Sequence, residues 1–440
     1  MATTRSGGAI PGRSKTSCLM RQSHLCLLIL LLNAPFSLAE ITGGYQTPNG
    51  ELFTVFPSGS EKNTYRVWNI TNGLIGRLTP DQNDGYVWKN DNSQQSSKVM
   101  IDASTIRRDG ELIARKLPFN LEQVEFESEG TKLSGIFVFP QGEGPFPLIT
   151  YAHGSGKGSI FNSGNPYSFP AFGIATFFFD KRGVGSSAGR YTQNFEILVQ
   201  DQLNAIDFAR AHPKVDADQI AILGVSLGGW IAPLSAEHRT DIKALLIRVG
   251  PTVSTLENDR WQALSPLYEK GYDAEAIAQA TEVVDAVHFI ARSNLKDGWR
   301  EFKTLKRKYR KTAWAKDIAG MPEAFLEHSR IGVKTYFWWS GGFSDPDWDP
   351  MILLRTLDIP IRWTFGGKDT QVPTARSVEL LNHEIEHNNK PWEIHLLPEA
   401  DHNLVAYKEL DGEKVLSHFS QAFLLDEALW LKQIFEASGR

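Results

Sequence analysis

Short, nearly continuous apolar runs recur along the chain from residue 148 onward, separated by polar and glycine-rich segments. These runs predict buried strands at 148–152, 174–179, 220–224, 244–249, 359–365 and 392–397. Apolar residues recur at helical spacing between Phe195 and His212, and an amphipathic helix is predicted over 422–437. Strands of this kind that alternate with helices are typical of a mostly parallel α/β sheet flanked by helices.

The chain ahead of these strands has a different pattern. Residues 40–118 are rich in strand-like segments and turns, including the hairpin dipeptides Asn49-Gly50 and Asp109-Gly110. From residue 121, two strands joined around Gly130 predict an antiparallel hairpin at the edge of the sheet. We therefore expect a small β-rich N-terminal module over 40–118 and an α/β domain over 119–440.

Residues 254–354 interrupt the series of strands. Their pattern is helical, most clearly between Ala274 and Ala291. Open α/β sheets bind ligands at the carboxyl ends of their strands, and an insertion after one strand is positioned to cover that edge. We expect 254–354 to form a helical lid inserted into the α/β domain.

The first 39 residues have the pattern of an export signal. Four basic residues precede an apolar run over 25–32, and small residues follow at positions 37 and 39. The run is shorter than the roughly 20 apolar residues that a spanning helix needs, which disfavours an uncleaved membrane anchor. We predict a signal peptide over 1–39, a periplasmic or secreted protein, and no integral membrane segment after cleavage.

Charge and cysteine content exclude several classes of function. The chain has 46 Lys and Arg against 51 Asp and Glu, a net charge of −5, which becomes −9 without the four basic residues of 1–39. A charge of this sign gives no basis for binding nucleic acid. Both cysteines, Cys18 and Cys26, lie within 1–39. The remainder can therefore use neither a cysteine nucleophile nor a cysteine-ligated zinc.

Two segments have the letters of cofactor motifs but the wrong context. Residues 183–188 read G-x-G-x-x-A after a predicted strand, but Gly189-Arg190-Tyr191 follows where a dinucleotide site needs an apolar helix. Aspartates at 345, 347 and 349 suggest a calcium loop, but Pro350 occupies the position that requires glycine. No cofactor and no metal site is predicted.

The strongest chemical motif is the segment Gly224-Val225-Ser226-Leu227-Gly228-Gly229. It follows a predicted strand and precedes a helical stretch, which is the context of a nucleophile elbow. Such a turn exposes the serine oxygen at a helix N-terminus, where the helix dipole stabilises a developing anion. Ser226 is the predicted nucleophile.

A serine hydroxyl needs a base, and the base is oriented by an acid. Asp369 follows the predicted strand 359–365, and His402 follows 392–397. Both stand at the carboxyl ends of strands, on the same edge as Ser226, in the chain order serine, acid, histidine. Asp369 is therefore the predicted acid and His402 the predicted base. The rival acids are Glu257, Asp259 and Asp401.

The loop after 148–152 completes the candidate site. An oxyanion hole needs two preorganised N–H donors. One is the Leu227 N–H, and the segment His153-Gly154-Ser155-Gly156 supplies the other, the Ser155 N–H. We expect His153, together with Gly154, to orient this loop rather than act as a base.

The motifs H-G-S-G, D-K-R-G-V-G-S-S, G-V-S-L-G-G, G-G-K-D-T-Q-V-P and A-D-H-N together resemble the α/β-hydrolase superfamily. The branch they resemble most is that of exported bacterial serine esterases related to dienelactone hydrolase and to the catalytic domain of prolyl oligopeptidases. The resemblance covers about 121–440. It implies the same roles for Ser226, Asp369, His402, Leu227 and Ser155. Dienelactone hydrolases carry a cysteine nucleophile, so lactone specificity does not transfer to a chain with Ser226.

The resemblance implies a serine hydrolase that cleaves small-molecule carboxylic esters through an acyl-enzyme. Three alternatives stay open: a serine exopeptidase of the prolyl oligopeptidase type, a thioesterase, and a catalytically silent binding protein on the same fold. Exopeptidases of that type carry a large β-propeller, which the roughly 80 residues before the α/β domain cannot form. An exported protein rarely meets acyl-CoA, which disfavours a thioesterase, and an intact triad disfavours a silent protein.

Overall fold

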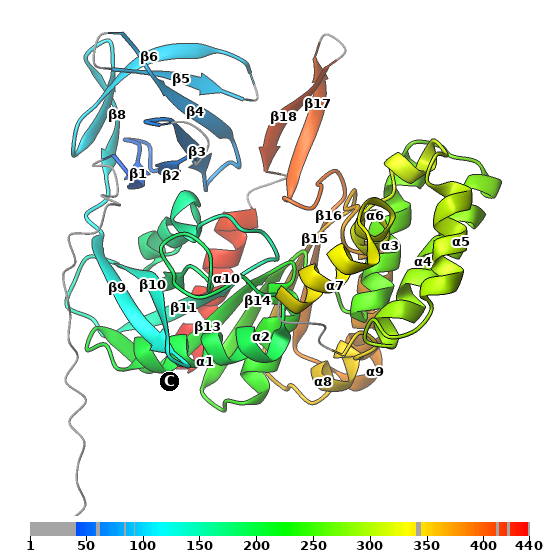
Figure 1. The fold of residues 1–440 in the computed structure, drawn as a ribbon. Coiled ribbons are helices and arrows are strands. Elements are labelled where there is room, and N and C mark those ends of the chain that lie inside the picture. The colour runs from blue at the N-terminus through cyan, green and yellow to red at the C-terminus, as the bar shows by residue number, and fades with distance from the viewer. Residues whose placement is uncertain are drawn as a thin grey trace, which may run out of the picture.

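The computed structural model describes residues 41–58, 62–82, 85–91, 93–339, 345–410, 413–419 and 423–438 (Figure 1). The predicted signal peptide over 1–39 lies outside these residues and stays a prediction. Within the described residues, no helix combines the length and the apolar character needed to cross a membrane.

The N-terminal module is a closed barrel in which each strand pairs with the next along the chain and β1 pairs with β8. Alternate side chains point inward, and Tyr45, Val55 and Val67 lie in the barrel core. Asp109 and Gly110, between β7 and β8, have φ angles of 50° and 82°, as a two-residue hairpin turn requires. The predicted β-rich module is confirmed, and its closure into a barrel is new. Its strands are β1 (Gly43–Gln46), β2 (Leu52–Pro57), β3 (Tyr65–Asn69), β4 (Ile75–Pro80), β5 (Tyr86–Asn90), β6 (Ser96–Ile101), β7 (Thr105–Arg108) and β8 (Glu111–Lys116).

The second part of the chain is built on an eight-stranded sheet with the order β16-β15-β14-β13-β11-β12-β10-β9. The strands from β16 to β12 are parallel, and β10 and β9 form the antiparallel hairpin predicted at the edge. The predicted α/β fold is therefore confirmed. Its strands are β9 (Asn120–Ser128), β10 (Thr131–Phe139), β11 (Phe146–Ala152), β12 (Ala175–Phe179), β13 (Val215–Val225), β14 (Ile242–Arg248), β15 (Ile361–Gly366) and β16 (Trp392–Leu397).

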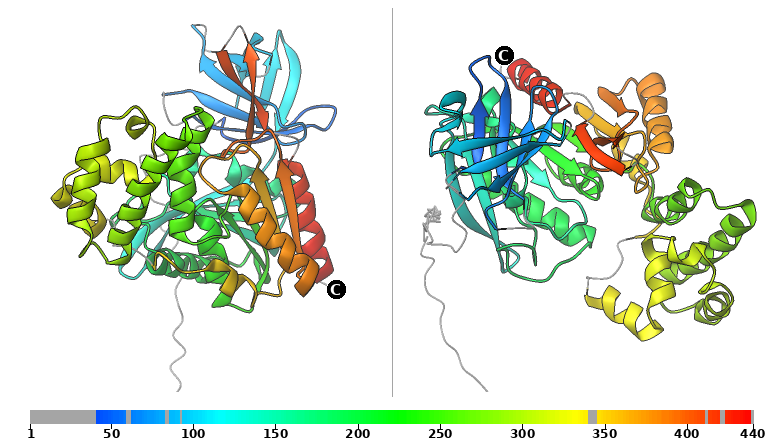
Figure 2. Two further views of the ribbon diagram at one scale, coloured as in Figure 1. Left: turned by 90° about the vertical axis from the view of Figure 1, so that its right-hand side faces the viewer. Right: turned by 90° about the horizontal axis from the view of Figure 1, so that it is seen from above.

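Helices cover both faces of this sheet, and successive side chains along each strand point to opposite faces. Ile222 and Leu245 belong to the core beneath α1 and α2, whereas Leu223 and Leu246 belong to the core beneath α10. Phe56 of the barrel belongs to this second core. The barrel therefore packs on the side of the sheet that α10 covers (Figure 2). The covering helices are α1 (Phe195–Arg210), α2 (Gly228–Glu237), α8 (Pro350–Leu354), α9 (Thr374–Asn388) and α10 (Phe423–Ser438).

A helical insertion separates β14 from β15, within the range 254–354 predicted as a lid. It has an apolar core of its own, which includes Val283, Val287 and Phe325. Figures 1 and 2 show the insertion and the barrel on opposite sides of the hairpin formed by β17 (Val405–Leu410) and β18 (Glu413–Phe419). The helices of the insertion are α3 (Thr255–Glu269), α4 (Ala274–Arg292), α5 (Trp299–Tyr309), α6 (Gly320–Glu327) and α7 (Arg330–Trp339).

This antiparallel hairpin follows His402 and was not among the predicted elements. It consists of β17 (Val405–Leu410) and β18 (Glu413–Phe419), and β18 contacts β4 of the barrel. The sequence contains a signal for it, because the hairpin dipeptide Asp411-Gly412 stands between the two strands. The loop that carries His402 therefore leads directly into a hairpin that contacts the barrel.

Candidate active site

The turn between β13 and α2 places Ser226 at the carboxyl end of a central strand. Ser226 has a φ of 53°, in the left-handed region that non-glycine residues rarely occupy. Glycines make this turn possible. A Cβ on Gly224 would lie 2.4 Å from the Gly228 carbonyl oxygen, and one on Gly228 would lie 2.1 Å from the Ala152 carbonyl oxygen. The strand, turn and helix predicted for an elbow are all present.

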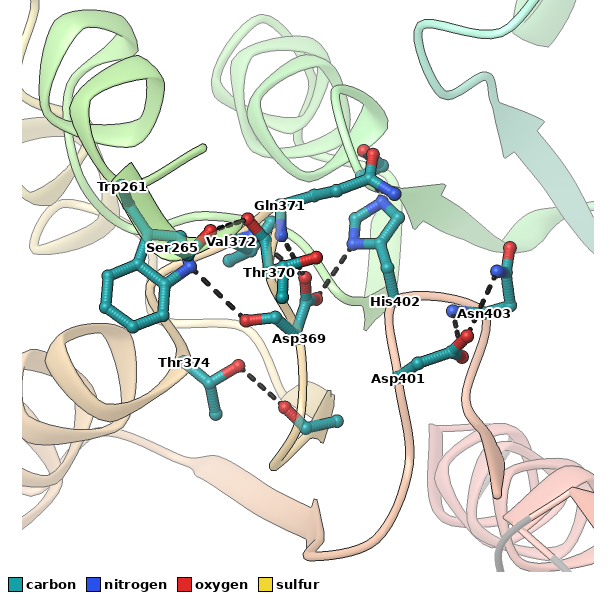
Figure 3. Close-up of polar contacts among 12 residues, drawn as sticks. Trp261, Ser265, Asp369, Thr370, Gln371, Val372, Thr374, Asp401, His402 and Asn403 are labelled. Carbon is teal, nitrogen blue, oxygen red and sulfur yellow. Dashed lines mark hydrogen bonds and ion pairs between the residues drawn. The ribbon is translucent and has the colours of Figure 1, made fainter. Parts of the chain in front are cut away.

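Ser226, His402 and Asp369 form one hydrogen-bonded chain. The His402 Nε2 atom lies 3.0 Å from the Ser226 Oγ atom. Figure 3 shows the other side of the imidazole, where His402 Nδ1 lies 2.8 Å from Asp369 Oδ2. The Asp369 side chain is fully buried, whereas 13% of the His402 side chain is exposed. A buried carboxylate at Nδ1 holds the tautomer in which Nε2 accepts the serine proton.

The loop that carries Asp369 is held from two sides. Asp369 Oδ1 accepts hydrogen bonds from the N–H groups of Gln371 and Val372 at 2.7 and 2.9 Å. From α3, Trp261 Nε1 donates to the Asp369 carbonyl oxygen at 3.3 Å, and Ser265 Oγ donates to the next carbonyl oxygen along the chain at 2.6 Å (Figure 3). The insertion thus positions the acid, a role that sequence analysis did not predict.

The three rival acids have other partners. Asp259 Oδ2 lies 2.8 Å from His288 Nε2 inside the insertion. Glu257 lies 3.7 Å from an arginine of α9, and Asp401 accepts hydrogen bonds from N–H groups of the loop that follows it. Of the acids in the described part of the chain, Asp369 alone forms an ion pair with His402.

The loop after β11 packs against the elbow. A Cβ on Gly154 would lie 3.3 Å from the Val225 carbonyl oxygen, so this backbone passes close to the nucleophile. Lys181 Nζ donates to the Gly154 carbonyl oxygen at 2.6 Å, and Tyr191 Oη donates to the Ser155 carbonyl oxygen at 2.5 Å. These two side chains hold the loop, and sequence analysis did not identify either.

The Ser155 and Leu227 N–H groups are available beside the nucleophile. Ser155, Ser226 and Leu227 line one cavity. In the described part of the chain, neither N–H group donates a hydrogen bond to a backbone carbonyl. The hydrogen bonds that Lys181 and Tyr191 donate to the Gly154 and Ser155 carbonyl oxygens fix the orientation of the peptide units in the loop. N–H donors held in this way are preorganised for an oxyanion.

His153 lies half-buried behind this loop. Its Nε2 atom lies 2.9 Å from the Phe179 carbonyl oxygen. Burial, with a smaller contribution from the charge of Lys181, lowers the pKa of His153 from 6.5 to about 3. The imidazole is therefore neutral at physiological pH, and Nε2 donates its proton to the carbonyl oxygen.

The lowered pKa of His153 predicts a loss of stability in acid. The unfolded chain takes up this proton near pH 6.5 and the folded protein only near pH 3, so acidification between these values favours unfolding. The contribution is at most about 1.4 kcal/mol per pH unit. Urea unfolding from about pH 7 to about pH 5 should show the stability advantage of the native protein over His153→Gln shrinking as the pH falls. A difference that does not depend on pH would contradict this assignment.

A cavity of 370 Å³ opens over Ser226, between the elbow and the insertion. Trp230 of α2 and Phe337 of α7 are among its apolar walls. Asn258 and Asp259 supply polar groups, and Asn258 Oδ1 is buried without a hydrogen-bond partner in the described part of the chain. Among the described residues that line this cavity, none is Lys, Arg or His.

A family model described as serine aminopeptidase, S33, matches residues 145–278. The match begins at β11 and covers the loop after it, the elbow and β14. It therefore covers the strands and turns that build the site around Ser226. The chain has the α/β-hydrolase fold.

Two of the curated relatives that match this α/β-hydrolase have limited similarity to it. Esterase EstD of Thermotoga maritima is 23% identical over 282 residues, which are 61% of this chain and 58% of the relative. Esterase FrsA of Enterobacter sp. is 30% identical over 149 residues, which are 33% of this chain and 35% of the relative. The α/β-hydrolase thus spans less than two thirds of either relative.

Among solved structures, an acylaminoacyl peptidase of Pyrococcus horikoshii is similar to this α/β-hydrolase with a TM-score of 0.42 and 15% identity. The similarity covers 80% of this chain and 50% of that one.

Proposed function

We propose that this α/β-hydrolase cleaves carboxylic esters through an acyl-enzyme. The observation that carries the proposal is the hydrogen-bonded chain from Asp369 through His402 to Ser226, with the serine on a strained elbow. The names of two relatives, both called esterases, also support it.

In the first half of the reaction, His402 Nε2 takes the proton of Ser226 as Oγ attacks the carbonyl carbon of the ester. The carbonyl oxygen becomes an oxyanion, which the N–H groups of Leu227 and Ser155 stabilise. The ester C–O bond then breaks, and His402 returns its proton to the departing alcohol oxygen. Ser226 is left acylated.

In the second half, water replaces the alcohol. His402 takes a proton from water as the water oxygen attacks the acyl carbon, and the same N–H donors stabilise the second oxyanion. The bond to Ser226 Oγ breaks, His402 reprotonates the serine, and a carboxylic acid leaves. Asp369 remains ionised and stabilises the imidazolium in both halves. These steps use only side chains, backbone donors and water, so they require no cofactor.

Cleavage of an aminoacyl amide is the second candidate. The matched family model is described as a serine aminopeptidase. Asp259 and the unpartnered Asn258 Oδ1 line the cavity over Ser226, and both can accept hydrogen bonds from an amino group. The same proton transfer by His402 would then release an amine in place of an alcohol.

A panel of p-nitrophenyl esters with acyl chains of graded length, measured beside aminoacyl p-nitroanilides, tests the proposal. We expect the esters to be hydrolysed faster, with a burst of p-nitrophenol where the acyl-enzyme accumulates. Faster cleavage of the anilides would favour the peptidase. If neither series is turned over and a fluorophosphonate probe does not label the protein, the remaining interpretation is a catalytically silent binding protein.

A further inference from the structure

The two members of the hydrogen-bonded Ser226–His402 pair line two different cavities. The first is the cavity of 370 Å³ beneath the insertion, and Ser226 lines it. The second, of 450 Å³, is lined by His402 and by the loop that leads into β17. The barrel supplies its opposite wall, with Phe56, Arg66 and Trp68. Its volume suits a small ring-bearing group.

Strand alternation builds the barrel wall of the second cavity. On β3, Tyr65 and Val67 point into the barrel core, so Arg66 and Trp68 point outward. Trp68 packs edge-on against Phe56, with the ring centroids 4.6 Å apart. This face of the barrel therefore presents an aromatic surface with a guanidinium group beside it.

The two cavities differ in charge. The first has the Asp259 carboxylate and, in its described wall, no cationic side chain. The second has Arg66 and Arg248 and, among the described residues that line it, no carboxylate. A substrate that fills both cavities would therefore place any anionic group in the second.

Arg66 is the cation that a ligand can reach. Arg248 is buried and committed to Glu427, with the Arg248 Nε atom 2.8 Å from Glu427 Oε2. Arg66 pairs with Asp91 at 3.1 Å, but 30% of its side chain is exposed. Arg77 lies opposite Arg66 on β4, so the single carboxylate of Asp91 faces more than one positive charge.

The direction of proton transfer indicates which cavity holds the leaving group. His402 must deliver its proton to the leaving oxygen, so the leaving group lies on the His402 side of the bond that breaks. Resting on the proposed ester hydrolysis, we propose that the second cavity binds the leaving group and that the N-terminal barrel forms its specificity wall. The leaving group it fits is an aromatic alcohol with a carboxylate, whose ring lies against Trp68 and whose carboxylate bonds to Arg66.

A pair of esters with one acyl group isolates this contact. 4-Carboxyphenyl butyrate and phenyl butyrate form the same acyl-enzyme, and their leaving groups differ by one carboxylate. The Arg66→Gln variant is expected to lower the ratio of their kcat/KM values roughly 10- to 100-fold, the range of one hydrogen bond to a charged group. The loss should fall on acylation, because the leaving group has departed before the acyl-enzyme is hydrolysed. Arg107→Gln is the matched control, since Arg107 is an exposed arginine of β7 outside the cavity.

Trp68→Leu tests the aromatic part of the wall. It should lower kcat/KM for phenyl butyrate more than for ethyl butyrate, whose leaving group has no ring. Trp88→Leu is the control for folding of the barrel, because Trp88 lies on β5, packs against Phe53 and does not line the cavity. Equal effects of the two tryptophan variants, or an unchanged ester ratio in Arg66→Gln, would overturn the inference. Absence of Ser226-dependent hydrolysis of either ester by the native protein would instead overturn the proposed function.

Discussion

Replacing Ser226 by alanine is expected to abolish ester hydrolysis, with kcat falling by about 10⁶-fold, as in other enzymes that lose a nucleophilic serine. Among the described residues, no hydroxyl other than that of Ser226 hydrogen-bonds to His402. Alanine would keep the left-handed turn at position 226, since the space around it is set by Gly224 and Gly228. The fold should therefore survive. The measurement is kcat on a p-nitrophenyl ester, together with labelling by a fluorophosphonate probe.

Thermal unfolding of Ser226→Ala serves as its control. A midpoint close to that of the native protein would assign the loss to chemistry rather than to misfolding. If the probe labelled the variant as strongly as the native protein, Ser226 would not be the nucleophile.

Asp369→Asn is expected to lower kcat by about 10⁴-fold while preserving the fold. The amide has the shape of the carboxylate, and its oxygen can still accept the N–H groups of Gln371 and Val372. Its NH₂ group, however, would face His402 Nδ1 and favour the tautomer protonated on Nε2. That tautomer cannot accept the proton of Ser226, whose Oγ lies 3.0 Å from His402 Nε2. Steady-state kinetics on the same ester measure the effect.

Glu257→Gln is the matched control for the acid. Glu257 is a rival acid from the sequence, and it lies on α3 in a loose ion pair 3.7 Å from Arg376. We expect its loss to change kcat little. A large fall in kcat for Glu257→Gln, with near-normal kcat for Asp369→Asn, would show that Glu257 of the insertion is the acid.

The candidate site was predictable because each residue type stands at a recognisable position along the chain. Ser226 lies in a glycine-flanked turn between a strand and a helix, and Asp369 and His402 follow strands directly. In a parallel sheet the carboxyl ends of the strands share one edge, so three such positions converge without knowledge of side-chain contacts. The supports of the site were not predictable in this way. Lys181 and Tyr191 come from the chain after β12, and nothing in their local sequence shows that they reach the carbonyl groups of the loop after β11.

The hairpin of β17 and β18 was predictable from the sequence, but its contact with the barrel was not. Its alternating strands and Asp411-Gly412 are local signals, which sequence analysis passed over. Its contact with β4, by contrast, joins segments more than 300 residues apart in the numbering and carries no local signal.

By itself, the sequence determined the order of strands and helices, the elbow and the triad candidates, because apolar periodicity and glycine turns act over a few neighbouring residues. Only the tertiary structure decided that β1 closes on β8, that α3 holds the Asp369 loop, and that the barrel shares a cavity with His402. Each of these depends on how distant segments pack. Pairing of distant segments is governed by the shape and burial of whole faces, which no short stretch of sequence contains.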